Sequence, residues 1–354
     1  MKKVAIITIT NSGLNFGNRL QNYALQKKLE QYGVLPETIL SSNVCMNSLI
    51  LSRIRRIVKR IVKASGRRRY FDGFGKKYIR YARRIRYGKL NETDFSKQYD
   101  AFIAGSDQVW NPNFHFNSDF EFMVFTQPGK RYSYAASFGV DDIPEEFLRK
   151  YKEWLSQMHT ISVREESGRK LVRALTGKEA LVHIDPTLLL TSEDYRKIEE
   201  KPRKEIPERY LLVYFLGEVP ETYKQFIAQT AERLCLKILE LSELPDTSLY
   251  DIGPQHFLYL FRHADYICTD SFHGTAMSIT FEKLFTVFFR QDRDVPMNAR
   301  IDSLLYKMDL YDRLYGRLTV EQSCMPIDYE KEKKLLEKER NEAEYYLRNL
   351  SLSW

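Results

Sequence analysis

The sequence predicts an α/β protein built from two parallel-sheet domains, and three observations lead to this prediction. Short apolar runs alternate with amphipathic segments along most of the 354 residues. Loops rich in Gly, Asn and Asp follow many of the apolar runs. A charged stretch with two prolines, residues 191–209, divides the alternation into two series. Alternating strands and helices indicate parallel sheets covered by helices, and the interruption indicates a domain boundary.

The first series predicts a Rossmann-like domain over residues 1–195. It opens with the apolar run Val4–Thr10, which is typical of a strand buried on both faces. A Gly/Asn loop follows, and residues 19–33 then show helical spacing of apolar positions, with Gly33 as the stop. Further β-loop-α patterns bring the domain to about five units, at residues 99–111, 129–139, 159–172 and 180–190.

The second series predicts a smaller Rossmann-like domain over residues 206–325. Its apolar runs lie at residues 210–217, 236–242, 265–270 and 284–289, with helical patterns between them. Residues 326–354 predict one long charged helix that packs back across the domains. Two such domains facing a cleft, with a long C-terminal helix, form a GT-B-like architecture. Ligands of such sheets bind beyond the carboxyl ends of the strands, so functional residues are expected there.

A basic helical insertion is expected at about residues 48–90. Residues 53–89 contain sixteen Lys or Arg and one acid, Asp72, and an Ile/Val stripe runs along residues 50–62. This pattern suits an interfacial helix on an anionic membrane, through residues 50–69, and it equally suits a solvated helix over a core. The apolar stripe favours a membrane over nucleic acid, and we expect no nucleic-acid partner.

The bulk composition limits the class of protein. The formal charge of +8 favours anionic partners, and the four cysteines lack metal or redox spacing, which is typical of free thiols in the cytosol. The apolar start predicts a strand rather than a signal peptide, because no cleavage pattern follows. No apolar stretch is long enough to span a bilayer, so we expect a cytoplasmic protein, or one peripheral on the inner face of the membrane.

The first candidate site follows the predicted strand at 265–270. Ser271 and His273 precede a helical pattern, and the amide groups of His273, Gly274 and Thr275 are expected to be free at the helix start. Free amides and the helix dipole favour an anion, and a histidine there can donate to a phosphate or transfer a proton. The alternative is a capped helix with a locally bonded histidine.

The second group of candidates follows strands of the first domain. Arg164 suits a carboxylate or phosphate, or else a surface ion pair with a neighbouring glutamate. Asp107 and Gln108 lie on a glycine loop, where Asp107 suits a base or a sugar-hydroxyl acceptor, or a simple turn. Asn15 and Asn18 precede a helix and suit a sugar or phosphate, without dinucleotide-binding spacing. His183 and Asp185, before Pro186, favour a structural turn.

Several stretches together resemble the polysaccharide pyruvyl transferase family. They are "NFGNRLQNYALQ", "YDAFIAGSDQVWN", "SYAASFG", "SVREESG", "HIDPTLLL" and "ADYICTDSFHGTAMSI", which span residues 15 to about 280. The resemblance implies a GT-B-like fold and transfer of the enolpyruvyl group of phosphoenolpyruvate onto two sugar hydroxyls as a ketal. No metal or other cofactor is expected, because phosphoenolpyruvate is a co-substrate and members of the family work without a metal.

The resemblance also implies roles for individual residues. Arg164 and His273 are expected in the phosphoenolpyruvate site, with Ser271, Gly274 and Thr275 beside them. Many members carry Arg where this chain has Ser271, and Arg290 is our candidate substitute. Protonation of the enol carbon calls for a general acid, assigned to His273, and Asp107 is assigned as the base. Asn15, Asn18, Asp107 and Gln108 are the expected acceptor-binding residues.

Three functions remain open on the sequence alone. The first is a ketal-forming pyruvyl transferase acting on a precursor of a capsule or exopolysaccharide. If that precursor is linked to a lipid diphosphate such as undecaprenyl diphosphate, the basic helix has a docking role. The second is a GT-B glycosyltransferase that uses a nucleotide sugar. The third is a non-enzymatic protein that binds a membrane or nucleic acid on a degenerate fold.

Overall fold

The computed structural model describes most of the chain, in two compact units. The described residues are 1–10, 14–42, 66–82, 85–86, 94–114, 118–242, 249–290 and 298–354. Unit 1 consists of Met1–Pro186 and Glu342–Trp354, and unit 2 of Thr187–Asn341. The sequence predicts a boundary at residues 195–206, whereas the division into units falls after Pro186. The Ile/Val stripe at 50–62 lies outside the described residues.

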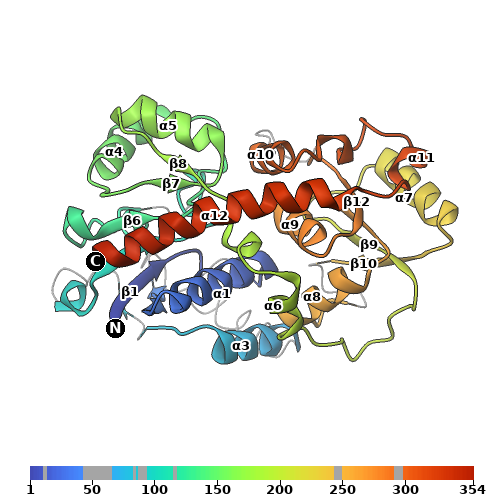
Figure 1. The fold of residues 1–354 in the computed structure, drawn as a ribbon, viewed down its shortest axis with the longest axis horizontal. Coiled ribbons are helices and arrows are strands. Elements are labelled where there is room, and N and C mark those ends of the chain that lie inside the picture. The colour runs from blue at the N-terminus through green and yellow to red at the C-terminus, as the bar shows by residue number, and fades with distance from the viewer. Residues whose placement is uncertain are drawn as a thin grey trace, which may run out of the picture. The chain divides into compact units, whose positions relative to one another are not determined.

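Unit 1 is a parallel α/β unit. Strands pair in the order β2-β1-β5-β6, and single parallel bridges, Tyr132 to Thr160 and Ala136 to Val163, connect β6 to the β7-β8 pair. The strands are β1 (Lys2–Ile7), β2 (Val34–Thr38), β3 (Ser41–Ser42), β4 (Ile85–Arg86), β5 (Ala101–Ala104), β6 (Arg131–Ser133), β7 (Ser162–Val163) and β8 (Leu181–Val182). The helices are α1 (Phe16–Gln31), α3 (Gly66–Tyr78), α4 (Glu145–Ser156) and α5 (Glu166–Thr176), with short 3-10 turns at Asp94–Gln98 and Pro128–Lys130 (Figure 1).

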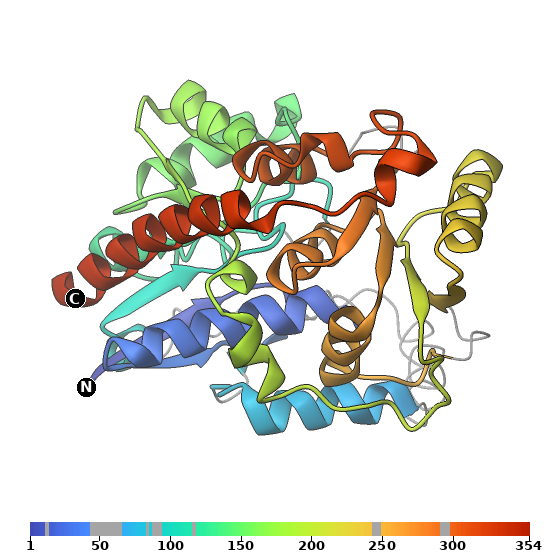
Figure 2. The ribbon, with the colours of Figure 1, turned by 45° about the vertical axis from the view of Figure 1, so that its right-hand side comes forward.

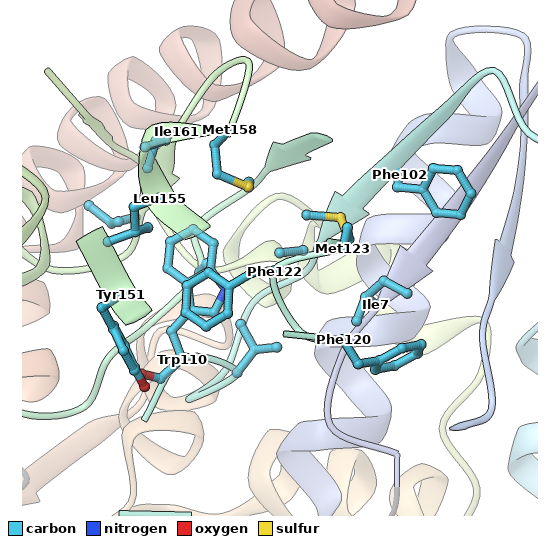
Figure 3. Packing of buried hydrophobic residues seen from close by; sticks show 14 of the residues in the cluster. Ile7, Phe102, Trp110, Phe120, Phe122, Met123, Tyr151, Leu155, Met158 and Ile161 are labelled. Carbon is cyan, nitrogen blue, oxygen red and sulfur yellow. The ribbon is translucent and has the colours of Figure 1, made fainter. Parts of the chain in front are cut away.

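Apolar strands and aromatic loops form the core of unit 1. The central strand β1 is buried from Val4 onward, as its continuous apolar sequence predicts. Trp110 and Phe122 stack with ring centroids 5.2 Å apart, beside Tyr151 and Met123 in the cluster that Figure 3 shows. The core therefore extends beneath the loop after β5, and holds this loop against the sheet.

Helix α3 is part of the basic segment and packs on the core of unit 1. Its Phe71 packs on Phe16, with ring centroids 5.2 Å apart, and Arg67 lies over the Phe16 ring at 4.5 Å. Arg67 also donates to the carbonyl of Leu14 at 2.8 Å. The opposite face, with Arg68 among its residues, is exposed. Within this described helix the apolar face covers the core of unit 1, which is the second of the two patterns expected from the sequence.

Unit 2 repeats the plan with a smaller parallel sheet in the order β10-β9-β11-β12. Its strands are β9 (Tyr210–Tyr214), β10 (Lys237–Leu241), β11 (Tyr266–Thr269) and β12 (Leu284–Val287). Its helices are α6 (Ser192–Arg196), α7 (Glu221–Arg233), α8 (Pro254–His263), α9 (Phe272–Thr280), α10 (Ala299–Lys307) and α11 (Val320–Ser323), with 3-10 turns at Pro186–Leu188 and Tyr311–Arg313. Figure 2 shows α9, in orange, beside β11 and β12.

The long helix α12 (Tyr329–Ser353) belongs to both units, and its residues change units after Asn341. In unit 2, Lys307 pairs with Glu339 at 2.5 Å. In unit 1, the Tyr346 hydroxyl donates to the carbonyl of Ser133 at 2.8 Å, at the end of β6. No helix within the described ranges is long and apolar enough to cross a membrane.

Candidate functional site

In unit 1 the loops after parallel strands converge at one edge of the sheet, because all strands run in the same direction. Ser106 and Asp107 follow β5, Arg164 follows β7, and Asp185 follows β8. The β5 and β7 loops reach each other across the bridges of Ala136, which pairs with Asp107 on one side and Val163 on the other. The fold thus gathers residues that lie far apart in the sequence.

Arg164 lies at the centre of this edge and is not exposed. Its side chain is 1% exposed, and its Nη1 lies 2.6 Å from Oδ2 of Asp185, which is wholly buried. The same nitrogen lies 3.4 Å from Oγ of Ser106, and Nη2 lies 3.6 Å from Oδ1 of Asp107. Ser106 donates to Oδ2 of Asp185 at 2.6 Å. Arg164 is therefore buried among carboxylates and does not lie at the surface, while Glu166, one of the two neighbouring glutamates, bonds Arg169.

The charges around the guanidinium determine its protonation. Burial alone would lower the pKa of Arg164, because a buried charge loses its hydration. The negative charges of Asp185, then Asp107 and Glu165, outweigh that effect, and the pKa of Arg164 is raised above its ordinary value. Arg164 is thus a permanent cation in surroundings that are already anionic.

Asp107 has an unusual backbone conformation. Its φ is +71°, in the left-handed region that non-glycine residues seldom occupy. Its carbonyl accepts from Val109 at 2.7 Å and from Ser137 at 3.0 Å, and its Oδ1 accepts from the Gln108 amide at 2.9 Å. These bonds hold the residue in place. Gln108 in turn packs against Gly139, where a Cβ atom would lie 2.3 Å from the Gln108 Oε1.

Glu165 connects the loop after β6 to the start of α5. Its Oε1 accepts from the hydroxyl of Ser137 at 2.9 Å, the amide of Phe138 at 2.8 Å and the amide of Gly139 at 3.3 Å. Glu165 is 1% exposed, so it is a third buried carboxylate at this edge. Its contacts fix the loop that carries Ser137, and through Ser137 they fix Asp107.

The predicted acceptor residues of α1 lie at the end of β1. Oδ1 of Asn15 caps the helix by accepting from the Asn18 amide at 3.0 Å. One turn further on, the Gln21 amide group donates to Thr8 at 2.8 Å, and Thr8 donates to the carbonyl of Ser106 at 3.0 Å. The start of α1 is therefore linked to the β5 loop through Gln21 and Thr8.

In unit 2 the loops after three neighbouring strands meet at Asp270. This residue is 2% exposed, and its two carboxylate oxygens accept from the amides of Leu216, at 2.7 Å, and Gly217, at 2.9 Å. Both amides follow β9. Arg290, which follows β12, places Nε 3.4 Å from Oδ2 of Asp270. The candidate cation Arg290 is thus tethered beside the residue that precedes Ser271.

The start of α9 differs in part from the sequence expectation. Ser271 is the N-cap, and its Oγ accepts the Gly274 amide at 3.3 Å. The Thr275 amide donates to the Ser271 carbonyl at 2.9 Å. The expectation of free amides at Gly274 and Thr275 is therefore wrong, because the cap and the first helical turn occupy them. Gly274 is needed for packing: a Cβ there would lie 2.4 Å from Oγ1 of Thr269.

His273 follows on this first turn. It is 7% exposed, and its ring stands edge-on to Phe272 with centroids 5.3 Å apart. The guanidinium of Arg300, from α10, lies 5.9 Å from the centre of the Phe272 ring. The described residues of unit 2 thus place two arginines, Arg290 and Arg300, around the His273 turn.

The structure brings together two sets of the predicted residues, one in each unit. Asp107, Gln108 and Arg164 gather in unit 1, and Ser271, His273, Gly274, Thr275 and Arg290 gather in unit 2. The sequence pattern assigned Asp185 to a turn and did not single out Asp270. Asp270 immediately follows the buried strand β11, and that position was the signal available for it, whereas Asp185 lies three residues after the short strand β8, which is not buried.

The fold and these strand-end loops define the class of protein. The chain is an α/β protein with parallel sheets and GT-B architecture, as predicted. A structure from Listeria monocytogenes, described as a UDP-N-acetylglucosamine 2-epimerase, matches with a TM-score of 0.53 and 12% identity, over 98% of this chain and 90% of that one. The Methanocaldococcus jannaschii UDP-GlcNAc 2-epimerase, in complex with UDP-GlcNAc and UDP, matches with a TM-score of 0.50 and 13% identity, over 99% and 100%. At these identities the likeness concerns the fold alone.

A family model of polysaccharide pyruvyl transferase matches residues 15–288, and the chain belongs to that family. The matched range includes Asp107, Arg164 and Asp185 of unit 1 and Asp270 and His273 of unit 2, and it ends two residues before Arg290. No curated protein matches the sequence. The resemblance seen in the sequence is thereby confirmed.

Proposed function

We propose that this protein transfers the enolpyruvyl group of phosphoenolpyruvate onto two hydroxyls of a sugar in a surface-polysaccharide precursor, such as that of a capsule or exopolysaccharide. The product is a pyruvate ketal, and phosphate is released. The observation that carries the proposal is the family match over residues 15–288, which includes Asp107, Arg164, His273 and Gly274.

The loops of unit 2 offer groups suited to the donor. Phosphoenolpyruvate bears a carboxylate and a phosphate, and arginine binds both with paired hydrogen bonds. Arg290 is 12% exposed at its side chain and is held by Asp270, so it is both oriented and accessible. His273 lies on the first turn of α9, where the positive end of the helix dipole favours an anion.

The proposed reaction uses His273 as the acid and Asp107 as the base. His273 protonates the methylene carbon, which becomes the methyl group, and the adjacent carbon becomes electrophilic. The first sugar hydroxyl adds to that carbon and gives its proton to Asp107. The carbon–oxygen bond to phosphate then breaks as the second hydroxyl adds, and the second proton leaves with the phosphate. Proton exchange with solvent restores both residues.

Donor binding provides the first test. Calorimetry or thermal shift should detect phosphoenolpyruvate, since ligand at 100 times its dissociation constant stabilises by about 2.7 kcal/mol. A panel of UDP-sugars serves as the comparison. His273→Asn should abolish phosphate release while leaving the fold intact. Binding of a UDP-sugar in place of phosphoenolpyruvate would instead favour a GT-B glycosyltransferase, the second function open on the sequence.

Two further parts of the proposal concern the surroundings of the reaction. The chemistry needs no metal, so activity should persist with a chelator present.

Residues 50–69 are proposed to dock on anionic lipid, near a lipid-linked precursor on the cytoplasmic side of the membrane. Sedimentation with vesicles containing anionic lipid tests this, and charge reversal at Arg68 and Arg69, which are exposed, should weaken it.

A further inference from the structure

The exposed face of helix α3 carries two short rows of basic side chains. Within Gly66–Tyr78, all of which the structure describes, the exposed residues are Arg68, Arg69, Asp72, Gly73, Lys76 and Lys77. The single acid among them, Asp72, has its Oδ2 3.4 Å from Nε of Arg68, and none of them is a large apolar residue. Residues four apart are neighbours on a helix surface, so these cations form one continuous polar face.

The apolar side of α3 is already occupied by the core of unit 1. Phe71 packs on Phe16 with ring centroids 5.2 Å apart, and the rings of Phe74 and Tyr23 lie 6.1 Å apart. Both phenylalanines of α3 are buried. A helix that inserts into a membrane interface needs its apolar side for the acyl chains. A membrane therefore meets α3 through its charged headgroups alone.

Both ends of α3 are bonded to the rest of unit 1, which holds the basic face in place. At the start, Arg67 donates to the carbonyl of Leu14 at 2.8 Å. Just beyond the end, the Arg80 amide donates to Oε1 of Gln26 at 2.9 Å, and the Arg80 carbonyl accepts from the Thr38 amide at 2.9 Å. A surface that is ordered before it binds loses little conformational entropy on binding.

We propose that unit 1 docks on an anionic lipid surface through the exposed face of α3, with the helix lying along the headgroups. This inference rests on the proposed function, which places the glycan precursor on a lipid diphosphate. Leu14, whose carbonyl Arg67 holds from the buried side of α3, directly precedes the predicted acceptor residue Asn15. Docking through α3 brings this acceptor loop to about 10 Å from the headgroups, the diameter of one helix.

Sedimentation with vesicles of equal parts phosphatidylglycerol and phosphatidylcholine tests this surface without any substrate. Lys76→Glu/Lys77→Glu reverses two cations of α3 that lie beyond residues 50–69. Arg149→Glu/Lys150→Glu is the control, because it makes the same change of net charge at exposed positions of α4, which lies apart from α3 in both Figure 1 and Figure 2. Since each basic residue near an anionic surface strengthens binding about 5-fold, the α3 pair should bind at least about 25-fold more weakly than wild type, and the α4 pair within about 3-fold of it.

Four results would overturn the proposal. An equal loss in both pairs would reduce the effect to net charge, and equal binding of the wild type to pure phosphatidylcholine would remove its electrostatic basis. Binding that persists at about 0.5 M NaCl would indicate apolar insertion, because salt screens contacts between exposed charges. Tighter binding to duplex DNA than to the vesicles would make nucleic acid the partner.

Calorimetry with phosphoenolpyruvate separates this inference from the proposed function. If the wild type binds the anionic vesicles but no phosphoenolpyruvate, the proposed function fails and the docking surface stands. If it binds phosphoenolpyruvate but no vesicles, the docking surface fails and the proposed reaction stands.

Discussion

Glu121 offers a sharp test of the structure because its carboxyl is buried without a cation among its described contacts. It is 6% exposed, and its Oε2 accepts from the amide of Ser118 at 2.9 Å and from the Ser118 hydroxyl at 2.8 Å. Its carbonyl accepts from the Trp110 indole at 3.2 Å, so the loop is fixed to the core. Burial raises the pKa of Glu121 to about 7, although the bonds from Ser118 act in the opposite direction.

The raised pKa makes stability depend on pH with a definite sign. Below about pH 4.5 the carboxyl of Glu121 is protonated in both the folded and the unfolded chain. As the pH rises toward about 7, the unfolded chain releases this proton while the folded protein retains it, and the free energy of unfolding falls. At 1.36 kcal/mol for each pH unit, the loss amounts to about 3 kcal/mol above pH 7.

Glu121→Gln removes the charge and keeps an oxygen that can accept from Ser118. The variant should therefore be about 2–3 kcal/mol more stable than the wild type at pH 8, and the gain should vanish near pH 4.5. Urea unfolding of both proteins at several pH values measures it. Glu153→Gln, at an exposed position of α4, is the matched control and should show no such trend. A stability difference between Glu121→Gln and wild type that is constant from pH 5 to pH 8 would refute the reasoning.

Three further changes test single contacts by urea unfolding. Gly274→Ala forces a Cβ to within 2.4 Å of the Thr269 hydroxyl, and should destabilise by about 1–3 kcal/mol; an unchanged midpoint would mean that the Thr269 side chain moves aside at no cost. Asp270→Asn weakens two charge-assisted bonds and should cost about 2 kcal/mol and lower donor affinity; unaltered affinity would separate Asp270 from donor binding. Tyr346→Phe leaves the buried Ser133 carbonyl without its donor and should cost about 1 kcal/mol, and no loss would argue against this docking of α12.

The strands could be predicted because a buried strand is a continuous run of apolar residues in the sequence. The strand Ala101–Ala104 lies at the start of the β-loop-α pattern expected at residues 99–111, and all four of its residues are buried. Strand β1, in contrast, spans Lys2–Ile7 and not Val4–Thr10, and the Thr8 hydroxyl just beyond its end donates to the carbonyl of Ser106 in the β5 loop. A continuous run of apolar residues predicts a buried strand well. It does not predict the residue at which the backbone hydrogen bonds of the strand end.

The partners of the candidate residues were less predictable, since they depend on strand order. Arg164 and Asp185 lie 21 residues apart, and their contact requires β7 and β8 to be neighbours in parallel register. Each of these strands is only two residues long, which is too short to give a periodic pattern. The left-handed backbone of Asp107 is likewise held by bonds to Val109 and Ser137, and the residue type gives only a weak signal, since Asp adopts this conformation more often than most non-glycine residues.

This chain departs from the family pattern at position 271, and contacts within unit 2 bear on that departure. Ser271 stands where many members carry arginine, and its hydroxyl caps α9. The carboxylate one residue earlier, Asp270, binds Arg290 from the end of the neighbouring strand β12. Parallel strands place their carboxyl ends at the same edge, so a cation supplied after β12 reaches the turn that a cation at position 271 would occupy. The contact of Arg290 with Asp270, the residue before Ser271, is what the proposed substitution of Arg290 for the family arginine requires.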